Sequence, residues 1–263
     1  MGNGCALFSS AFLSFAALIL AIVACAGSTK NYNPINKIYE AQLDLSNMQV
    51  STVLSSATSS STSLDALGLP SYINLGLWSY CIADSSGKVS SCTSPSGIQD
   101  FNLKNMIYDN IENNQVAELV SSVAELAIPD SMQSNLTHYN NLIKCTFITL
   151  IIGIVVSFLN FAVNVLRWLV HLSLITWLGR FFSLIAFLSL GVAAGTSTGT
   201  YVYIRRLLSS SYSDYGMKLD LGRNFYAILW ASVAAALLNL IVWSTVRSQR
   251  YARVVPIEEK PLM

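Results

Sequence analysis

Four long apolar runs without a charged residue constrain this 263-residue chain more than any other feature. Each has about 20 residues or slightly more, the length that an α-helix needs to cross the hydrocarbon core of a bilayer. Charged residues make up only 11% of the chain, against about 25% in soluble domains. We therefore expect an all-α membrane protein built as a four-helix transmembrane bundle. The runs are Leu7–Ala26, Cys145–Leu166, Phe181–Tyr203 and Phe225–Val246.

The first run also resembles a cleaved signal peptide, because Ala24-Cys25-Ala26 has the small residues of a cleavage site. However, no Lys or Arg occurs in the first 29 residues, and the run exceeds the roughly 7–15 residues of a signal-peptide core. We favour an uncleaved first helix. The start Met1–Cys5 resembles an acylation signal, but Ala6 stands where myristoylation requires Ser or Thr. Palmitoylation of Cys5 and a plain buried cysteine both stay open.

A long polar segment between the first two runs carries ten acidic and four basic residues. Its part Ser51–Ser63 is dense in Ser and Thr, and is either a flexible linker or an O-glycosylated stretch. Further along, apolar residues with a period of about 3.6 predict an amphipathic helix over Asn105–Ala127. Asn135 begins an N-glycosylation sequon, Asn-Leu-Thr.

The same segment contains Gly76-Leu77-Trp78-Ser79-Tyr80-Cys81, followed by a second cysteine, Cys92. The β-branched and aromatic residues of Tyr72–Ala83 predict one strand, and Asp84–Lys88 is a cluster of turn residues. Val89–Cys92 can return antiparallel, and a disulfide between Cys81 and Cys92 would then staple the hairpin. Such a bond needs an oxidising compartment. Trp78 either packs in the hairpin core or anchors the segment to the outer leaflet.

Two of the apolar runs carry residues suited to helix packing. In the second run, Ser157, Asn160 and Asn164 share one helical face and are expected to hydrogen-bond across helices, with a polar permeation path as the alternative. The third run has two overlapping GxxxG units, formed by glycines at helical spacing that let another backbone approach closely. Packing within the chain and self-association between subunits both fit this pattern. The glycines are Gly191, Gly195 and Gly199.

The sidedness of the chain follows from the cysteines more than from its charges, because Lys and Arg are nearly even on the two sides. The disulfide and the sequon place the long segment outside, so both termini are expected in the cytoplasm. The segment Arg167–Arg180, with two Trp and His171, predicts an interfacial connection between the second and third helices. After the fourth helix, a cationic tail is expected to contact anionic lipid head groups through Arg247, Arg250 and Arg253.

These boundaries divide the chain into four parts. Residues 1–27 form the first helix and residues 28–141 an extracellular domain; residues 142–246 hold helices two to four, and residues 247–263 a cytoplasmic tail. The chain has only two His, and no nucleophile motif or metal-ligand spacing occurs, so we expect neither an enzyme nor a cofactor. The net charge of +1 gives no reason to expect nucleic acid as a partner.

Gly76-Leu77-Trp78-x-x-Cys81 followed by Cys92, between four spans, resembles the first-loop signature of the claudin superfamily. The long Ser-rich loop is unlike animal claudins and is similar to the fungal claudin-like family that includes PalI and eisosome-associated plasma-membrane proteins. Ile22–Ser28, Tyr72–Cys81 and Pro256–Pro261 are similar to a budding-yeast member linked to nitrogen stress, filamentous growth and cell-wall integrity. The resemblance implies a four-helix bundle with a small disulfide-stapled extracellular sheet, in sterol-rich furrows of the plasma membrane. Claudins have a further tryptophan upstream in this loop; here the loop holds no second Trp, and Tyr32 or Tyr39 stays open as its replacement.

Two functions compatible with this resemblance stay open. The first is a membrane organiser, a homo-oligomer that gathers sterol or sphingolipid and binds cytosolic eisosome coat proteins. The second is a sensor or an accessory subunit of a transport or signalling complex, with the acidic loop facing the cell wall.

Overall fold

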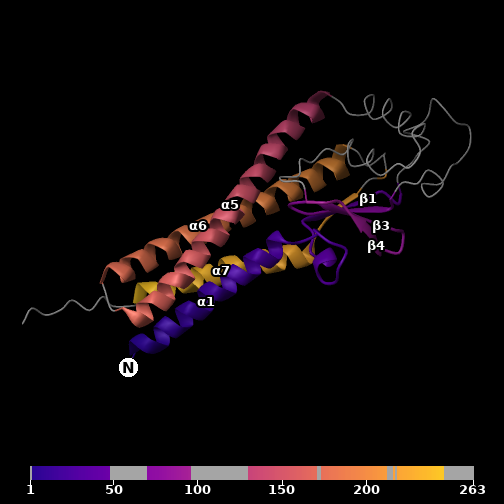
Figure 1. Cartoon of the computed structure of the whole chain (residues 1–263). Coiled ribbons are helices and arrows are strands. Elements are labelled where there is room, and N and C mark those ends of the chain that lie inside the picture. Colours follow the sequence, from indigo (N-terminus) through magenta and orange to yellow (C-terminus); the bar gives the residue numbers. More distant parts are fainter. Residues whose placement is uncertain are drawn as a thin grey trace, which may run out of the picture.

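Four long helices lie side by side in the computed structural model (Figure 1). They are α1 (Gly2–Cys25), α5 (Asp130–Leu169), α6 (Ser173–Ser211) and α7 (Arg223–Thr245). Each contains a stretch long and apolar enough to cross a membrane, which confirms the four spans expected from the sequence. The structure describes residues 2–47, 70–95, 130–170, 173–211, 216 and 218–245.

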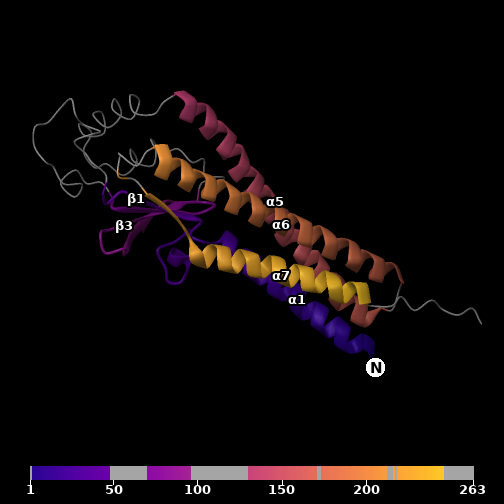
Figure 2. The same cartoon turned by 180° about the vertical axis from the view of Figure 1, so that it is seen from behind.

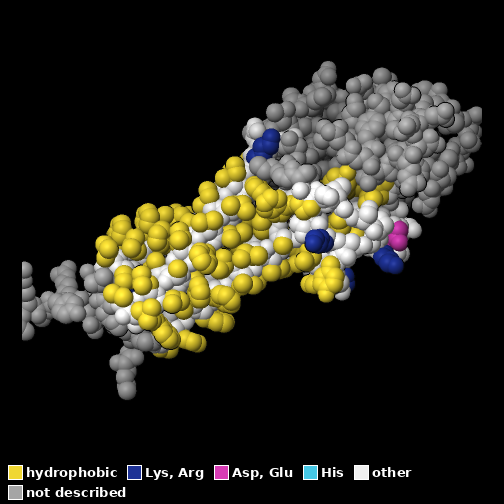
Figure 3. All heavy atoms as spheres, viewed as in Figure 1, with side chains coloured by type: hydrophobic (Ala, Val, Ile, Leu, Met, Phe, Trp, Pro, Cys, Tyr) yellow, Lys and Arg dark blue, Asp and Glu magenta, His cyan; other side chains and the backbone are white. Residues whose placement is uncertain are grey.

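The face of the bundle seen in Figure 3 is apolar along most of the helices' length. Large hydrophobic side chains point outward from every helix, among them Phe12 (64% exposed), Phe158, Leu188 and Leu238. In that view, the visible Lys and Arg side chains gather toward the end that carries the sheet. Contiguous apolar surface of this extent is unfavourable in water and favourable in lipid, so the distribution fits a bundle that spans a bilayer.

The connection between the second and third helices is much shorter than the expected Arg167–Arg180. Helix α5 continues to Leu169 and α6 begins at Ser173, so Arg180 lies inside a helix. No proline interrupts this stretch, and Trp177 stacks on Phe181 one turn later with ring centroids 5.5 Å apart. Arg180 Nε donates to the carbonyl oxygen of Trp243 at 3.1 Å, which joins α6 to α7. His171 lies outside the described residues.

A five-stranded antiparallel sheet lies at the end of the bundle away from the N-terminus (Figures 1 and 2). Its strand order is β4-β3-β2-β1-β5. The first four strands come from the long loop, whereas β5 comes from the short loop between α6 and α7. The strands are β1 (Ala41–Asp44), β2 (Tyr72–Leu75), β3 (Tyr80–Ala83), β4 (Val89–Cys92) and β5 (Lys218–Leu221), and a short 3-10 helix, η1 (Ile35–Lys37), precedes them.

The single strand expected over Tyr72–Ala83 is two strands, β2 and β3, joined by a tight turn. Leu75 pairs with Tyr80 across the turn, and Gly76 N donates to Ser79 O at 3.0 Å. Gly76 lies against backbone that leaves no room for a side chain, so this tight turn needs a glycine at its first position. The return hairpin is confirmed: β3 pairs antiparallel with β4, with Cys81 opposite Cys92.

Two apolar clusters hold these parts together. The larger lies inside the bundle, where small residues such as Ala21 of α1 and Ala193 of α6 let each of these helices pack closely against α5 and α7. The second lies under the sheet, where Leu43 and Ile73 pack against Tyr201 and Leu208 of α6. The sheet is therefore packed on the C-terminal part of α6.

Several expected features fall outside the described residues. They are the Ser51–Ser63 tract, the Asn105–Ala127 helix and the tail with Arg247, Arg250 and Arg253. Asn135 lies within the range of α5, in a part whose side chains are not described.

Candidate functional site

The turn between β2 and β3 lies against the C-terminal end of α1, and Gly76 explains how. A Cβ at this position would come 2.8 Å from Gly27 O and from Ser28 Cβ, closer than real contacts allow. Residue 76 therefore has to be glycine for the turn to lie against the chain that leaves α1. Gly76, the first residue of the Gly-Leu-Trp signature, is therefore required for steric reasons.

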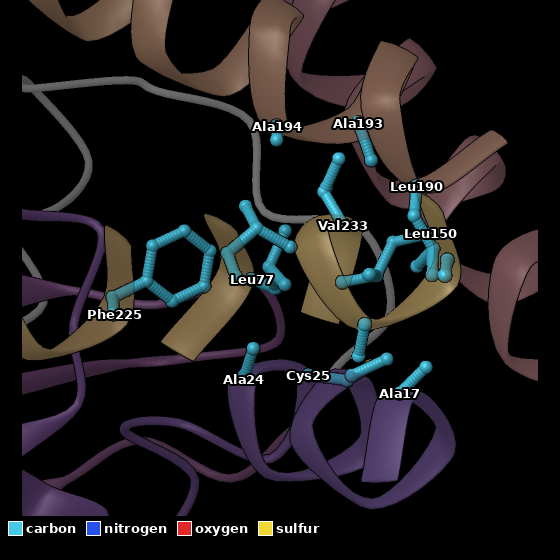
Figure 4. Close-up of a cluster of buried hydrophobic side chains, with 14 of the residues drawn as sticks. Ala17, Ala24, Cys25, Leu77, Leu150, Leu190, Ala193, Ala194, Phe225 and Val233 are labelled. Carbon is cyan, nitrogen blue, oxygen red and sulfur yellow. The ribbon is translucent and has the colours of Figure 1, made fainter. Parts of the chain in front are cut away.

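Leu77, the next residue, is buried inside the bundle although it belongs to the loop. It is 2% exposed and lies among side chains of α1 and α7 (Figure 4). In that view its neighbours include Ala24, Phe225 and Val233. Burying a leucine side chain contributes about 1.5–3 kcal/mol, so Leu77 stabilises the contact between the turn and the adjacent ends of α1 and α7.

Trp78 contacts two helices at once. Its indole Nε1 donates to Cys25 Sγ of α1 at 3.2 Å, and its ring meets Phe147 of α5 edge-on with centroids 4.7 Å apart. Edge-to-face aromatic pairs contribute about 0.5–1.5 kcal/mol beyond their buried area. The half-buried Trp78 therefore packs against the bundle core, and not in the core of the hairpin as one alternative had it.

Ser28 connects this turn to the end of α1 through hydrogen bonds. It follows the end of α1 with a φ of 56°, a left-handed conformation that reverses the chain direction at a helix end. Its hydroxyl donates to Ile38 O at 3.0 Å, and its own carbonyl accepts a 2.6 Å hydrogen bond from Ser79 Oγ. Both hydroxyl groups are buried, so these bonds join α1, the turn and the segment before β1.

The expected disulfide is present between Cys81 of β3 and Cys92 of β4, with an S–S distance of 2.07 Å. Cys81 is fully buried behind the turn. Asn31 Nδ2 donates to Val89 O at 3.0 Å, which ties the chain after α1 to the same hairpin. The disulfide thus joins the edge strand β4 to its neighbour β3.

Glu40, just before β1, is a buried acidic residue that the sequence did not single out. It is 1% exposed, and its carboxylate oxygens accept hydrogen bonds from Ser197 Oγ at 3.0 Å and Tyr201 Oη at 3.1 Å. Burial raises the pKa of the Glu40 carboxyl from 4.5 to about 7, although both hydrogen bonds act in the opposite direction. An isolated Glu in an acidic loop is normally solvated, so the sequence offers no signal for its burial.

Polar side chains also meet inside the bundle, in the half away from the sheet. Asn164 Nδ2 donates to Ser14 Oγ of α1 at 3.3 Å, which is the interhelical contact expected for this residue. Asn239 of α7, which the sequence analysis missed, accepts from Ser10 Oγ at 2.6 Å and donates to Ser183 Oγ at 3.3 Å. Asn239 therefore links three helices. Asn160 is likewise buried, at 1% exposure.

The three glycines of α6 do not pack against another helix of the chain. A Cβ added at Gly191, Gly195 or Gly199 would meet no atom within 4 Å among the described residues. Packing within the chain is therefore not their role in this structure. They form a small-residue stripe on the outer surface of α6, and self-association remains a prediction.

The described residues contain no group of three or more His, Cys, Asp and Glu side chains able to hold a metal ion. The cluster around Glu40 consists of one carboxyl and hydroxyl groups, and the turn supplies steric and apolar contacts. These are the elements of a structural junction between the sheet and the helix ends.

Four apolar spans, a disulfide-linked sheet on one end and a Gly-Leu-Trp turn that packs against the helix ends define a claudin-like four-span membrane protein. Residues 6–242 match the SUR7/PalI family, and the chain belongs to that family. It is 56% identical to Protein PUN1 of Saccharomyces cerevisiae (strain ATCC 204508 / S288c) over 266 residues, which cover all of both chains. An uncharacterized protein of the same strain is 22% identical over 207 residues, covering 72% of this chain and 26% of its own length.

Proposed function

We propose that this protein is a non-enzymatic organiser of the plasma membrane, which assembles laterally and marks an eisosome-type domain. In this role it supports cell-wall integrity, the stress response and filamentous growth, with both termini in the cytoplasm. Its membership in the SUR7/PalI family and its full-length similarity to Protein PUN1 support the proposal at the level of the family.

The observation that carries the proposal is the exposed glycine stripe of α6. The stripe leaves open space beside Gly191, Gly195 and Gly199 on a surface that faces lipid. Small residues at a spacing of four let two helix backbones approach within van der Waals distance. In lateral assembly, the α6 helix of a second copy of the chain would fill the open space beside these glycines.

The junction at the outer helix ends supports a fixed ectodomain. Because Leu77 and Trp78 are packed into the bundle and Ser79 is bonded to Ser28, the sheet has a defined position on the helices. A rigid outer domain presents the same face in every copy, which a regular lateral array needs. In the same proposal, the tail arginines bind anionic lipid and cytosolic coat proteins, and the lateral array gathers sterol or sphingolipid.

A sensor or an accessory subunit of a transport or signalling complex is the second candidate. It is favoured by Glu40, because that residue connects the outer sheet directly to α6 through Ser197 and Tyr201. A movement of the sheet would be transmitted to a membrane-spanning helix.

Imaging separates the two candidates. The full chain carrying a C-terminal fluorescent tag is expressed beside a marker of eisosomes. Patches that coincide with the marker, and that persist when each candidate transporter or receptor is deleted, support the organiser. A uniform distribution, together with loss of a transport or signalling output on deletion of this protein, would favour the accessory subunit instead.

A further inference from the structure

Glu40 holds the outer sheet to the bundle through three different elements. Its side chain accepts hydrogen bonds from Ser197 and Tyr201 of α6. Its backbone N–H donates to Leu75 O of β2 at 2.7 Å, and its carbonyl accepts from Gly222 N at 3.0 Å, just before α7. One residue therefore joins the sheet, α6 and the start of α7.

The backbone around Glu40 cannot shift to let water in without breaking this packing. A Cβ on Gly222 would overlap the carbonyl oxygen of Tyr39, so the chain at residues 39 and 40 lies directly against the entry to α7. The neighbouring residues Ile38 and Ala41 are buried as well. The Glu40 carboxyl consequently depends on the groups that face it for solvation.

Among the residues that the structure describes, the titratable groups that face Glu40 carry no positive charge. They are Cys25 from α1, Tyr201 from α6 and Tyr226 from α7, whose hydroxyl lies 3.2 Å from Ser197 Oγ. A buried carboxylate without a cation is unfavourable, and the group tends to keep its proton instead. In line with this, burial raises the pKa of Glu40 from 4.5 to about 7.

We propose that Glu40, Ser197 and Tyr201 form a proton-dependent latch: the protonated carboxyl holds the outer sheet on α6, and loss of the proton loosens that contact. The direction follows from the two states of the chain. Between pH 4.5 and about 7, the docked state keeps a proton that the undocked, solvated carboxyl releases. Docking is therefore strongest in acid, weakens as the pH rises through this window, and changes no further above it.

The test compares the thermal unfolding temperature of the full chain in lipid nanodiscs, from pH 5 to pH 9, with that of Glu40→Gln. Gln is neutral at every pH and imitates the protonated carboxyl. We expect the two proteins to unfold at similar temperatures at pH 5, and the variant to be the more stable at pH 8. Asp84→Asn serves as the control, because Asp84 is an exposed acidic group in the β3–β4 turn and its pKa is lowered by the Ser86 hydroxyl.

Hydrogen exchange locates the effect. Amides of residues 38–45 in the wild type are expected to exchange faster at pH 8 than at pH 5, after correction for intrinsic rates, and those of Glu40→Gln to show no such change. A difference between wild type and Glu40→Gln that is the same at all pH values would overturn the proposal.

Two further variants keep the proposal testable if Glu40→Gln does not fold. Ser197→Ala and Tyr201→Phe each remove a hydrogen bond that favours the ionised carboxylate. Both should move the midpoint of the pH-dependent loss of stability to higher pH. Tyr203→Phe is the matched control, since Tyr203 is on the same helix but is 52% exposed. Midpoints that coincide with that of Tyr203→Phe would contradict the latch.

Discussion

Ser79 Oγ donates a 2.6 Å hydrogen bond to the carbonyl oxygen of Ser28, a residue 51 positions earlier in the chain. Both residues are fully buried, and the bond fastens the Gly-Leu-Trp turn to the end of α1. The turn is thereby part of the bundle although it connects two strands of the sheet. The stability of the outer sheet and that of the helices should consequently depend on each other.

Substitution of Gly76 by Ala should destabilise the protein by about 1–3 kcal/mol, the usual cost of forcing extra atoms into a packed site. The added Cβ would lie 2.8 Å from Gly27 O and from Ser28 Cβ. Thermal unfolding of the purified variant in detergent measures the loss. Gly191→Ala is the matched control, because its Cβ meets open space and should leave the unfolding temperature unchanged or slightly raised. Equal unfolding temperatures for the two variants would refute the steric role of Gly76.

Replacing Cys81 or Cys92 by Ser should lower the surface level of the protein, since the bond closes a short loop and contributes about 3 kcal/mol in the chain-entropy model. Surface biotinylation measures the level, and migration on a non-reducing gel reports the bond. Cys145→Ser controls for the loss of a thiol, because Cys145 is free in the structure. Normal surface levels and an unchanged gel shift in both single variants would rule out the disulfide.

Asn239→Leu should destabilise the bundle by about 1 kcal/mol, because it removes two interhelical hydrogen bonds and each is worth about 0.6 kcal/mol on average in a membrane protein. A double-mutant cycle with Ser10→Ala isolates the Ser10–Asn239 bond in unfolding measurements. The cycle should give a coupling energy of about 0.5 kcal/mol or more. Strictly additive effects would show that this contact does not stabilise the helix pair.

Gly195→Leu should leave the fold intact and reduce cross-linking between copies in the membrane. The leucine side chain projects into open space in the single chain but would separate two helices packed along the stripe. Val155→Leu enlarges an outward residue on a different helix, α5, and serves as the control. Retention of wild-type cross-linking by Gly195→Leu, at normal expression, would exclude this stripe as the contact between subunits.

Features with a regular sequence signal could be predicted, and features created by tertiary contact could not. The four spans follow from apolar length alone, and the β3–β4 hairpin follows from turn residues between Cys81 and Cys92. The sequence predicts a continuous strand across the β2–β3 turn, because the aromatic and apolar residues of that turn have high strand propensity. Its conformation is decided by Gly27 and Ser28, which are about fifty residues away in sequence.

Among the buried polar residues, too, some could be predicted from a sequence pattern and others could not. Asn164 could be singled out because it shares a helical face with Ser157 and Asn160. Glu40 and Asn239 could not be, since each is an isolated polar residue whose partners lie on other elements. Burial of an isolated polar group depends on the packing of the whole chain, which no local pattern encodes.

The position of β5 imposes an order on biosynthesis. Strand β1 pairs on one side with β2 and on the other with β5, whose residues Lys218–Leu221 are translated long after those of β1. The sheet can therefore be completed only after α6 and the loop that follows it have been synthesised. Until then β1 lacks one of its two strand partners and exposes an open hydrogen-bonding edge, the kind of edge that can pair with another chain.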